Sequence, residues 1–353
     1  MNKVKDIKGL TRQELEEWLE DEGFNRFRGQ QVFNWLYRNG VKNPEDMQNL
    51  PGTLIEYLRK KGRWLNLTLK NRLRAADGTI KYLWQLTDNN TVESVYLPDD
   101  DYGRRSVCIS SQVGCNMGCK FCATGLNGLQ RNLTTGEIID QILSIQSDIS
   151  QGKFGDPALT NVVFMGMGEP LANLDNLLKA VEIINDSRGL NIGMRRMTIS
   201  TVGIIPGIKK LAHHNPQIGL AVSLNAPNDR LRNQLMPVNK KYPLASLLEV
   251  IENYIGQTHR RVTFEYVLIR DINDKPYHAD QLVKLLKGLN CHVNLIPLNP
   301  IGDLPYERPG EETIRRFQGI LTDEGITATL RRERGTNIEA ACGQLRRAKG
   351  GVE

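Results

Sequence analysis

The sequence predicts an α/β protein in which a partial barrel of six strand-helix units, a partial (β/α)6 barrel, carries the functional site. Strand and helix patterns alternate six times beyond residue 102, and repeated units of this kind form parallel sheets. A loop with three cysteines directly follows the first of these strands, and active sites lie beyond the C-terminal ends of barrel strands. An open doubly wound sheet also accommodates six units, but the position of the cysteine loop favours the barrel.

Residues 1–63 predict a small helical module ahead of the barrel. Thr11 and Glu14 form a capping box before an amphipathic segment, and further helical patterns follow at 27–36 and 54–58. The third segment ends in several basic residues. A helical module with a basic rim is a common device for binding nucleic acid, and a plain scaffold is the alternative interpretation.

Residues 64–100 change to the alternating pattern of strands and predict a β-hairpin connection. The expected strands and turns are, in order, 67–70, the Asp77-Gly78 turn, 80–86, the Asn89-Asn90 turn and 91–97. We expect this connection to deliver Glu93 toward the main domain.

The main domain is expected to span residues 101–353. Thr134 and Glu137 supply an N-terminal capping box for its first helix. The expected strands are 106–110, 161–165, 197–201, 219–224, 262–269 and 293–297, with helices near 135–151, 173–187, 206–214, 243–256, 277–288 and 311–323.

Length and composition indicate a globular protein of the cytoplasm. The chain has 353 residues, of which 40% are hydrophobic, enough for one large α/β domain and a smaller one. It contains no run of about eighteen apolar residues, and its first residues lack the apolar stretch of a secretory signal, so no membrane association is expected. Six cysteines, three of them in one loop, indicate metal or redox chemistry rather than a disulfide framework.

The net charge of +6 is modest, but the basic residues are grouped. Such groups suit a polyanion, because each phosphate contact releases counterions. A solvated, solubilising face is the alternative for any one group taken alone. The groups are Arg59, Lys60, Lys61 and Arg63; Lys70, Arg72 and Arg74; Arg331, Arg332 and Arg334; and Arg346, Arg347 and Lys349.

The loop from Cys115 to Cys122 is the strongest chemical signal in the chain. Cys115, Cys119 and Cys122 place three soft thiolate ligands in one short loop. A closed structural zinc site needs four ligands, and no fourth Cys or His lies in the loop. A four-iron cluster could instead keep one iron open for a substrate. A zinc site completed from a distance, a disulfide and unrelated buried thiols remain as alternatives.

Further candidate residues lie at the ends of the predicted strands. Gly168 and Glu169, after the second strand, combine a close backbone approach with an acceptor for an ammonium group. Taken alone, each of the other strand-end residues is better explained as a cap or turn residue. These others are Ser200, Ser223, Leu224, Asn225 and Asn299.

Cys342 is a candidate nucleophile near the C-terminus. It lies in a loop of small residues beside Gly343. The arginines at 331, 332 and 334 are expected to lower the pKa of the Cys342 thiol, and a lowered pKa activates a cysteine.

Taken together, these motifs carry a family resemblance. The cysteine loop, with Phe121 before its last cysteine, resembles the signature of the radical S-adenosylmethionine (SAM) enzymes. With the stretches at 125–138, 166–170 and 331–345, almost the whole chain is similar to the RlmN family of RNA adenine C2 methyltransferases. The related Cfr enzymes, which methylate adenine C8, share most of these motifs.

The resemblance implies the cofactors and partners. One [4Fe-4S] cluster would be held by Cys115, Cys119 and Cys122, and two SAM molecules would be used per turnover, one as methyl donor and one as the source of a 5′-deoxyadenosyl radical. The strand-end residues from Gly168 to Asn299 would bind SAM. Flavodoxin or ferredoxin would supply electrons to a monomeric enzyme acting on 23S rRNA at adenosine 2503 and on tRNA at adenosine 37.

The resemblance also implies roles for three residues. Cys342 would carry a methyl group that is added to the electron-poor C2 of adenine, Glu93 would act as general base, and Cys108 would attack Cys342 to release the RNA from a covalent adduct. Without the resemblance, Cys108 reads as a small buried hydrophobe and Glu93 as an exposed strand carboxylate. A Cfr-type C8 methyltransferase and a non-catalytic iron-sulfur RNA-binding protein are the competing hypotheses.

Overall fold

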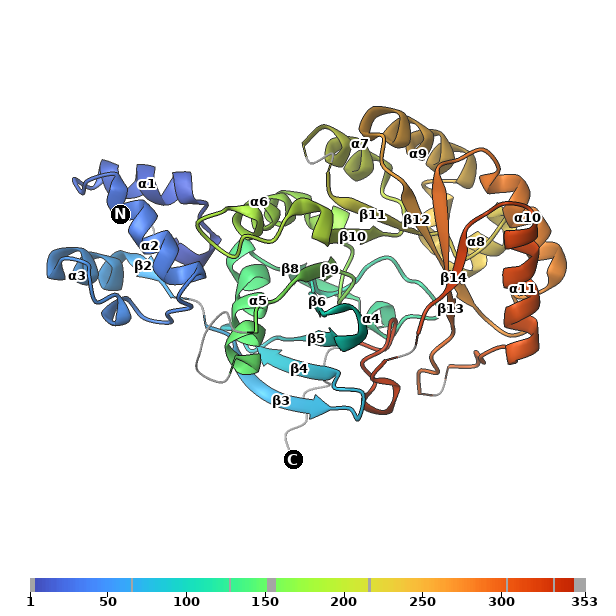
Figure 1. Cartoon of the computed structure of the whole chain (residues 1–353), viewed down its shortest axis with the longest axis horizontal. Coiled ribbons are helices and arrows are strands. Elements are labelled where there is room, and N and C mark those ends of the chain that lie inside the picture. The colour runs from blue at the N-terminus through green and yellow to red at the C-terminus, as the bar shows by residue number, and fades with distance from the viewer. Residues whose placement is uncertain are drawn as a thin grey trace.

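The fold of the main domain is one long mixed sheet with helices on its outer side (Figure 1). The computed structural model describes residues 4–64, 66–126, 128–150, 157–214, 217–302, 304–332 and 334–345. The basic group Arg346, Arg347 and Lys349 lies outside these residues. In the described chain the sheet has ten strands, and β14 and β3 form its two edges, so the sheet does not close.

Seven neighbouring strands of this sheet are parallel and form the barrel-like part. The six predicted strands are confirmed to within two residues at each end, and the strand predicted at 197–201 coincides with β10. The parallel strands are β6 (Arg104–Cys108), β9 (Asn161–Phe164), β10 (Met197–Thr201), β11 (Gly219–Ser223), β12 (Val262–Leu268), β13 (Cys291–Pro297) and β14 (Ala328–Leu330).

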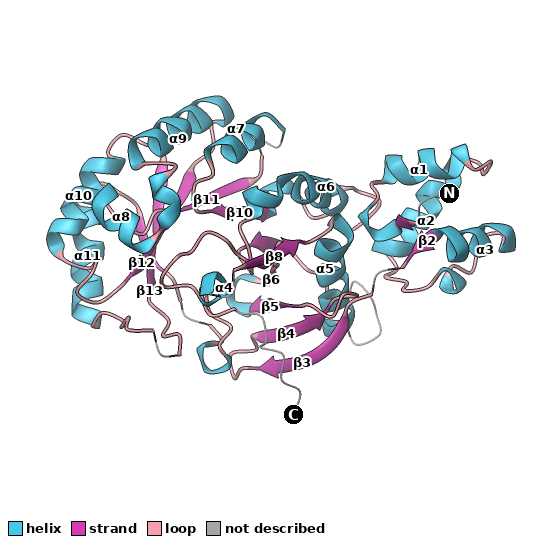
Figure 2. Cartoon of the chain, turned by 180° about the vertical axis from the view of Figure 1, so that it is seen from behind, coloured by secondary structure: helices cyan, strands magenta, loops and turns pink. Residues whose placement is uncertain are grey.

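Helices alternate with these strands, as predicted, and flank the sheet in both views (Figure 2). The capping box of Thr134 and Glu137 is present at the start of α5. Several short elements of the main domain, among them β14 and α8 (Asp229–Leu235), were not predicted, because three and seven residues are too few for a clear hydrophobic period. The longer helices are α5 (Thr135–Ile149), α6 (Leu174–Asn185), α7 (Ile205–His214), α9 (Leu244–Thr258), α10 (Pro276–Leu286) and α11 (Glu311–Asp323).

The predicted hairpin region extends the sheet instead of linking two separate bodies. β3 (Thr68–Arg74), β4 (Ile80–Gln85) and β5 (Thr91–Asp99) pair antiparallel, and β5 pairs in turn with β6. Both predicted turns contain a residue with positive φ, at Gly78 (79°) and Asn89 (66°). In this register Val95 lies opposite Cys108. The antiparallel strands therefore bring their side chains to the edge of the barrel.

The N-terminal region is helical, and its first segment anchors it to the main domain. It contains α1 (Arg12–Asp21), α2 (Phe27–Tyr37) and α3 (Gly52–Lys61), and β1 (Lys5–Asp6) pairs with β2 (Gly62–Arg63). The predicted capping box opens α1. Lys8 forms a buried ion pair of 2.5 Å with Asp140 of α5, and the Tyr37 hydroxyl donates to the Lys8 carbonyl at 2.9 Å.

A small two-stranded ribbon positions the cysteine loop. β7 (Gln112–Gly114) pairs with β8 (Leu129–Asn132), and the cysteine loop and α4 (Ala123–Leu126) lie between them in the chain. Gly114 has φ of 77°, and a Cβ there would lie 1.9 Å from the carbonyl oxygen of Gly128. Only glycine permits this close crossing of the two ends of the loop. Within the described residues no helix combines the length and the apolar character needed to cross a membrane.

Candidate active site

Backbone hydrogen bonds hold the cysteine loop in place at the mouth of the barrel. The Cys115 amide donates to the Gly128 carbonyl at 3.1 Å, and the Lys120 amide donates to the Leu235 carbonyl at 3.0 Å. Cys115 and Cys119 are buried, whereas Cys122 is half-buried. All six cysteines are free thiols, which argues against the disulfide alternative in this state.

The environment of the three thiols fits an iron-sulfur cluster. Burial raises the pKa of Cys115 to about 12 and that of Cys119 further still, and repulsion from Cys122 adds to both shifts. Thiolates here are therefore costly unless a metal centre neutralises them. Among the described residues, no three His, Cys, Asp or Glu side chains surround a point where a single metal ion would bind. A cluster has a different requirement, since it binds each thiolate at a separate iron.

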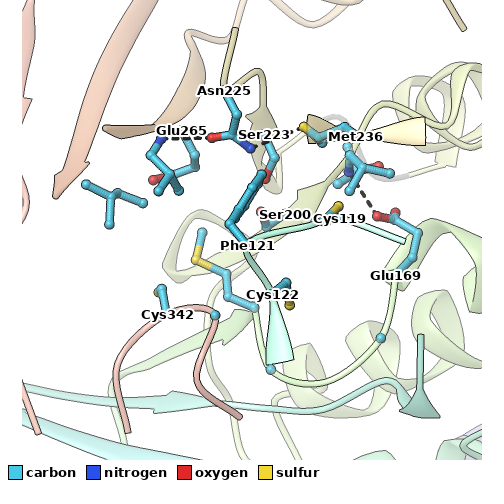
Figure 3. Close-up of a pocket in the computed structure, with 18 of the residues that line it drawn as sticks. Cys119, Phe121, Cys122, Glu169, Ser200, Ser223, Asn225, Met236, Glu265 and Cys342 are labelled. Atoms are coloured by element: carbon cyan, nitrogen blue, oxygen red, sulfur yellow. Dashed lines mark hydrogen bonds between the residues drawn. The ribbon is translucent and has the colours of Figure 1, made fainter. Parts of the chain in front are cut away.

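A first cavity opens from the cysteine loop across the C-terminal ends of the parallel strands (Figure 3). It has about 870 Å³ of empty volume, part of it open to solvent. Figure 3 shows Cys342 and Glu169 toward opposite sides of this space, with Cys119 and Cys122 between them. Six of the seven predicted SAM-binding residues line it: Gly168, Glu169, Ser200, Ser223, Asn225 and Asn299.

Glu169 presents a buried carboxyl group in this cavity. Its oxygens accept from the backbone amides of Leu171 at 3.1 Å and Val202 at 2.9 Å. Burial raises the pKa of Glu169 to about 7, although these amide donors oppose the shift. Gly168 has φ of 102°, and a Cβ there would lie 2.6 Å from that of Gln112. The turn thus requires glycine and fixes a carboxyl group that suits an ammonium ligand.

Leu224 is the predicted residue that the structure does not bring into the cavity. Its side chain is fully buried in the core, and its amide donates to the Glu265 carbonyl at 3.0 Å. The chain turns immediately afterwards at Asn225, whose φ is 58°. Asn225 therefore lines the cavity in place of its neighbour, and its Oδ1 accepts from the Val267 amide at 2.8 Å.

The sequence analysis missed two buried charged residues next to this cavity. Glu265 on β12 lines it, and its carboxyl accepts from Asn294 at 2.8 Å; burial raises the pKa of Glu265. Arg232 on α8 is fully buried behind the strand ends, and burial lowers the pKa of Arg232 to about 10. Neither residue belongs to a recognisable motif, so only the three-dimensional structure reveals their burial.

A second cavity, with about 1240 Å³ of empty volume, adjoins the first and contains both Cys108 and Cys342. Cys342 and Asn299 line both cavities. The second cavity combines apolar walls with four arginines, which we call the arginine rim. The rim consists of Arg104, Arg331, Arg332 and Arg334.

The loop carrying Cys342 is tied to the cysteine loop and to the end of β13. The Ala123 amide donates to the Gly343 carbonyl at 2.8 Å. The Thr124 hydroxyl donates to the Leu345 carbonyl at 2.5 Å, and Asn299 Nδ2 donates to the Cys342 carbonyl at 3.4 Å. These bonds hold a segment from the end of the described chain against the cysteine loop.

The structure contradicts the expectation that nearby arginines lower the pKa of the Cys342 thiol. Burial raises the pKa of the Cys342 thiol, and the opposing effect of Arg331 does not reverse this shift. Burial likewise raises the pKa of Cys108 to about 12, and repulsion from Cys342 contributes in the same direction. The two thiols are thus close enough to interact electrostatically, and both favour the protonated form.

Glu93 is buried and paired, contrary to its interpretation as an exposed carboxylate. Its Oε1 lies 3.3 Å from Lys81 Nζ of the neighbouring strand. Residues two apart on a strand face the same side, so Glu93 shares its face with Val95, which lines the second cavity. The side chain of Glu93 does not itself line either cavity.

The comparisons with known proteins agree with this geometry. Residues 109–282 match the radical SAM superfamily, and residues 5–62 match the N-terminal domain of ribosomal RNA large subunit methyltransferases. A crystal structure of a radical SAM methyltransferase from Sphaerobacter thermophilus superimposes with a TM-score of 0.92 at 46% identity, covering 97% of this chain and 99% of that one. The fold and the site therefore define a radical SAM enzyme, with a SAM molecule and a [4Fe-4S] cluster as the cofactors of that superfamily.

Similarity to curated proteins gives the family. A probable dual-specificity RNA methyltransferase RlmN from Symbiobacterium thermophilum is 48% identical over 96% of this chain and 91% of its own length. The protein of the same description from Bacillus thuringiensis is 46% identical over 98% and 94%. The chain belongs to the RlmN family of radical SAM RNA methyltransferases.

Proposed function

We propose that this enzyme methylates C2 of adenosine in both 23S rRNA and tRNA. The dual specificity named for its relatives supports two RNA substrates. The observation that carries the proposal is the position of Cys342 at the junction of the two cavities, with Cys119 and Cys122 lining the first and Cys108 lining the second. A methyl group on Cys342 would be within reach of a ligand in either cavity.

The first cavity is the proposed SAM site. Cys115, Cys119 and Cys122 hold one cluster, Glu169 accepts from the SAM ammonium group, and the polar residues from Ser200 to Asn299 contact the rest of the molecule. When bound there, cluster and SAM supply a 5′-deoxyadenosyl radical. Two SAM molecules are used per turnover, because methylation of Cys342 and formation of the radical each consume one.

Cys342 serves as the methyl carrier because C2 of adenine is electron-poor and has no lone pair with which to attack SAM. The sulfur of Cys342 first receives a methyl group. After that group has lost a hydrogen atom, its carbon bonds to C2 and ties the RNA to the enzyme. The position of Cys342 in both cavities supports this transfer.

Glu93 and Cys108 complete the reaction in this proposal. The adduct would pass one electron back to the iron-sulfur centre held by Cys115, Cys119 and Cys122, and Glu93 removes the C2 proton as general base. Cys108 loses its proton and attacks the sulfur of Cys342. A disulfide forms, the sulfur-carbon bond breaks, the released methylene carbon takes up a proton to become the methyl group, and the methylated RNA leaves. The shared cavity of the two thiols supports this step, and the ion pair with Lys81 holds Glu93 in position.

The second cavity is the proposed site of the target nucleotide. Its apolar walls suit a purine ring, and the arginine rim suits the flanking phosphates. The basic N-terminal module would add affinity for RNA outside the cavity. We further propose that the enzyme acts as a monomer in the cytoplasm and receives electrons from flavodoxin or ferredoxin.

Two other functions remain as alternatives. A Cfr-type enzyme would use the same residues to methylate C8, with a different tilt of the base in the second cavity. A non-catalytic iron-sulfur RNA-binding protein would have no need for Cys108 beside Cys342, so this pairing favours an enzyme.

Product analysis distinguishes these functions. The cluster-loaded protein is incubated with a reductant, SAM and unmodified 23S rRNA or tRNA, and the RNA is then digested to nucleosides. We expect 2-methyladenosine from both RNAs. Formation of 8-methyladenosine would establish the Cfr-type activity, and unmodified adenosine from both RNAs would support the binding protein.

A further inference from the structure

Arg232 places a positive charge inside the protein without a carboxylate beside it. Its side chain is 0% exposed. In the part of the chain that the structure describes, no carboxylate forms an ion pair with its guanidinium. Asp229, one turn earlier on α8, acts on it only at longer range, and Asp229 Oδ1 accepts instead from Asn239 Nδ2 at 2.8 Å and from the Leu244 amide at 2.9 Å. The hydrogen bonds of Arg232 go instead to neutral acceptors: the carbonyl oxygens of Val202 (2.7 Å), Ser223 (3.2 Å) and Leu224 (3.0 Å) and Oδ1 of Asn239 (2.8 Å).

This arrangement satisfies the donors of Arg232 but leaves its charge without a directly bonded counter-ion, since Asp229 acts only at longer range. Carbonyl and amide oxygens carry only partial negative charge, and a buried ion without a counter-ion is strongly unfavourable. Arginine also keeps its proton where lysine would lose it. A buried guanidinium without a directly bonded carboxylate is therefore suited to a further anion nearby.

The nearby groups that can supply this anion are the thiols of the cysteine loop. The helix that carries Arg232 packs against this loop, because the Lys120 amide donates to the Leu235 carbonyl at 3.0 Å and Cys119 lies in one hydrophobic cluster with Leu235 and Met236. The hydrogen bonds of Arg232 also reach Val202 and Ser223, and both residues line the first cavity. The guanidinium is thus held directly behind the wall that faces the proposed cluster and SAM.

We propose that Arg232 is a positioning residue whose charge balances the anionic iron-sulfur centre held by Cys115, Cys119 and Cys122 and favours its reduced form. This inference rests on the proposed cluster site. Reduction adds one electron from an external donor and thus one negative charge, and a fixed positive charge nearby stabilises the more negative state. Arg232 would therefore raise the reduction potential of the cluster as well as hold the ends of β10 and β11.

The test compares Arg232→Gln with wild type and with Arg230→Gln, an exposed arginine on the same helix. The cluster of each full-length protein is titrated with dithionite and followed by electron paramagnetic resonance. We expect Arg232→Gln to reduce the ratio of reduced to oxidised cluster about tenfold at a fixed potential, which is a shift of about 59 mV for one electron. Arg230→Gln should stay close to wild type.

A second variant keeps the test informative if Arg232→Gln does not fold. Asn239→Asp is nearly isosteric and puts a carboxylate at the position that is now 2.8 Å from the guanidinium. We expect it to lower the reduction potential in the same direction. The substitution also removes the hydrogen bonds that Asn239 Nδ2 donates to Asp229 Oδ1 at 2.8 Å and to Asn233 Oδ1 at 2.9 Å, so the quantity compared is the difference between the cluster-loaded and the cluster-free form. The thermal stability added by cluster binding should be smaller than in wild type.

Two results would overturn the inference. An unchanged potential in both Arg232→Gln and Asn239→Asp would leave Arg232 with a purely structural role. Equal loss of thermal stability in the cluster-free and cluster-loaded forms of Arg232→Gln would lead to the same conclusion. Failure of the proposed cluster site itself is recognised separately, because wild-type protein would then bind no cluster.

Discussion

The two cavities that meet at Cys342 differ in their chemistry. Both have apolar walls, and the first adds hydroxyl, amide and thiol groups and the buried carboxyls of Glu169 and Glu265. The second has apolar walls and four arginines, of which only Arg331 also lines the first. A site with carboxyl groups suits a cation such as SAM, whereas an arginine rim suits a polyanion. The difference shows how one thiol can face two ligands of opposite charge.

The two cavities also differ in how the chain builds them. The first follows the ends of successive parallel strands, the usual position of a site in an α/β fold. The second joins β5 and β6 to the C-terminal segment. Contacts such as Arg334 with Asp99, 3.2 Å apart, and Lys81 with the Glu339 carbonyl at 3.2 Å close this junction. The second cavity therefore depends on segments that are distant in sequence.

The largest effects should come from removing either Cys119, a thiol of the first cavity, or Cys342, the thiol that both cavities share. Cys119→Ala is expected to lose the brown chromophore, SAM cleavage and product together, because the cluster loses a ligand. Cys342→Ala is expected to lose product just as completely but to keep the chromophore. Absorption spectra measure the chromophore, and assays of 5′-deoxyadenosine measure SAM cleavage. A Cys119→Ala protein with about four irons and normal SAM cleavage would contradict the proposed cluster site.

Cys108→Ala should block only the last step. We expect it to cleave SAM and attack the RNA but to stall as a protein-RNA adduct, because no second thiol then lies in the second cavity to attack Cys342. The adduct migrates slowly on a denaturing gel and disappears after nuclease treatment. Cys291→Ala is the matched control and should turn over normally. Normal turnover of Cys108→Ala without an adduct would exclude the proposed role.

The contrast between the cavities also explains what the sequence could predict. The six predicted strands of the barrel and both capping boxes follow from local periodicity and are confirmed. Since the C-terminal ends of parallel strands share one edge, residues such as Glu169 and Ser200 could be assigned to one cavity before the structure was known. Leu224 was misplaced because a single left-handed residue, Asn225, changes which side chain faces the cavity.

What the sequence could not predict depends on tertiary contacts. Arg232 is one of many arginines in the chain, and its acceptors come from Val202 and Ser223, on other segments. The ion pair of Lys81 with Glu93 requires the register of the hairpin, in which Leu83 lies opposite Glu93. The pKa of Cys342 was wrongly expected to fall because burial, which outweighs the charge of Arg331, is not visible in a motif.

The carboxyl group of the first cavity predicts a pH dependence. Since burial raises the pKa of Glu169 to about 7, the carboxylate that we propose to bind the SAM ammonium group forms only as the pH rises through this value. We expect the affinity for SAM, measured by calorimetry, to increase about fivefold between pH 6 and pH 7. In Glu169→Gln the affinity should be lower and nearly independent of pH. An equally steep dependence in that variant would assign the titration to another group.

The rim of the second cavity should affect RNA and not SAM. Arg104 and Arg332 are exposed, so Arg104→Glu with Arg332→Glu should weaken RNA binding several-fold and reduce the salt dependence by about 0.7 to 0.9 for each lost phosphate contact. SAM binding should be unchanged. Lys284→Glu with Lys287→Glu, two exposed lysines at the C-terminal end of α10, controls for net charge. Equal weakening in the control would indicate a nonspecific charge effect.

The smallest effect is expected at the N-terminal module, which lies at the opposite end of the molecule from α11 (Figure 1). Its basic group has ion pairs of Lys60 with Glu56 at 2.6 Å and Arg63 with Asp6 at 3.9 Å. Exposed ion pairs of this kind contribute little stability. These basic side chains can therefore leave their carboxylate partners and bind phosphates instead.

Arg59→Glu with Lys61→Glu should therefore weaken RNA binding only a few-fold and flatten its salt dependence. Methylation of Cys342 by SAM should remain intact, because that step takes place in the first cavity without RNA. The matched control is Arg315→Glu with Arg316→Glu, two exposed charges on α11. If the salt dependence of the N-terminal variant equals that of the control, the basic group is a solvated face, and RNA recognition lies with the arginine rim.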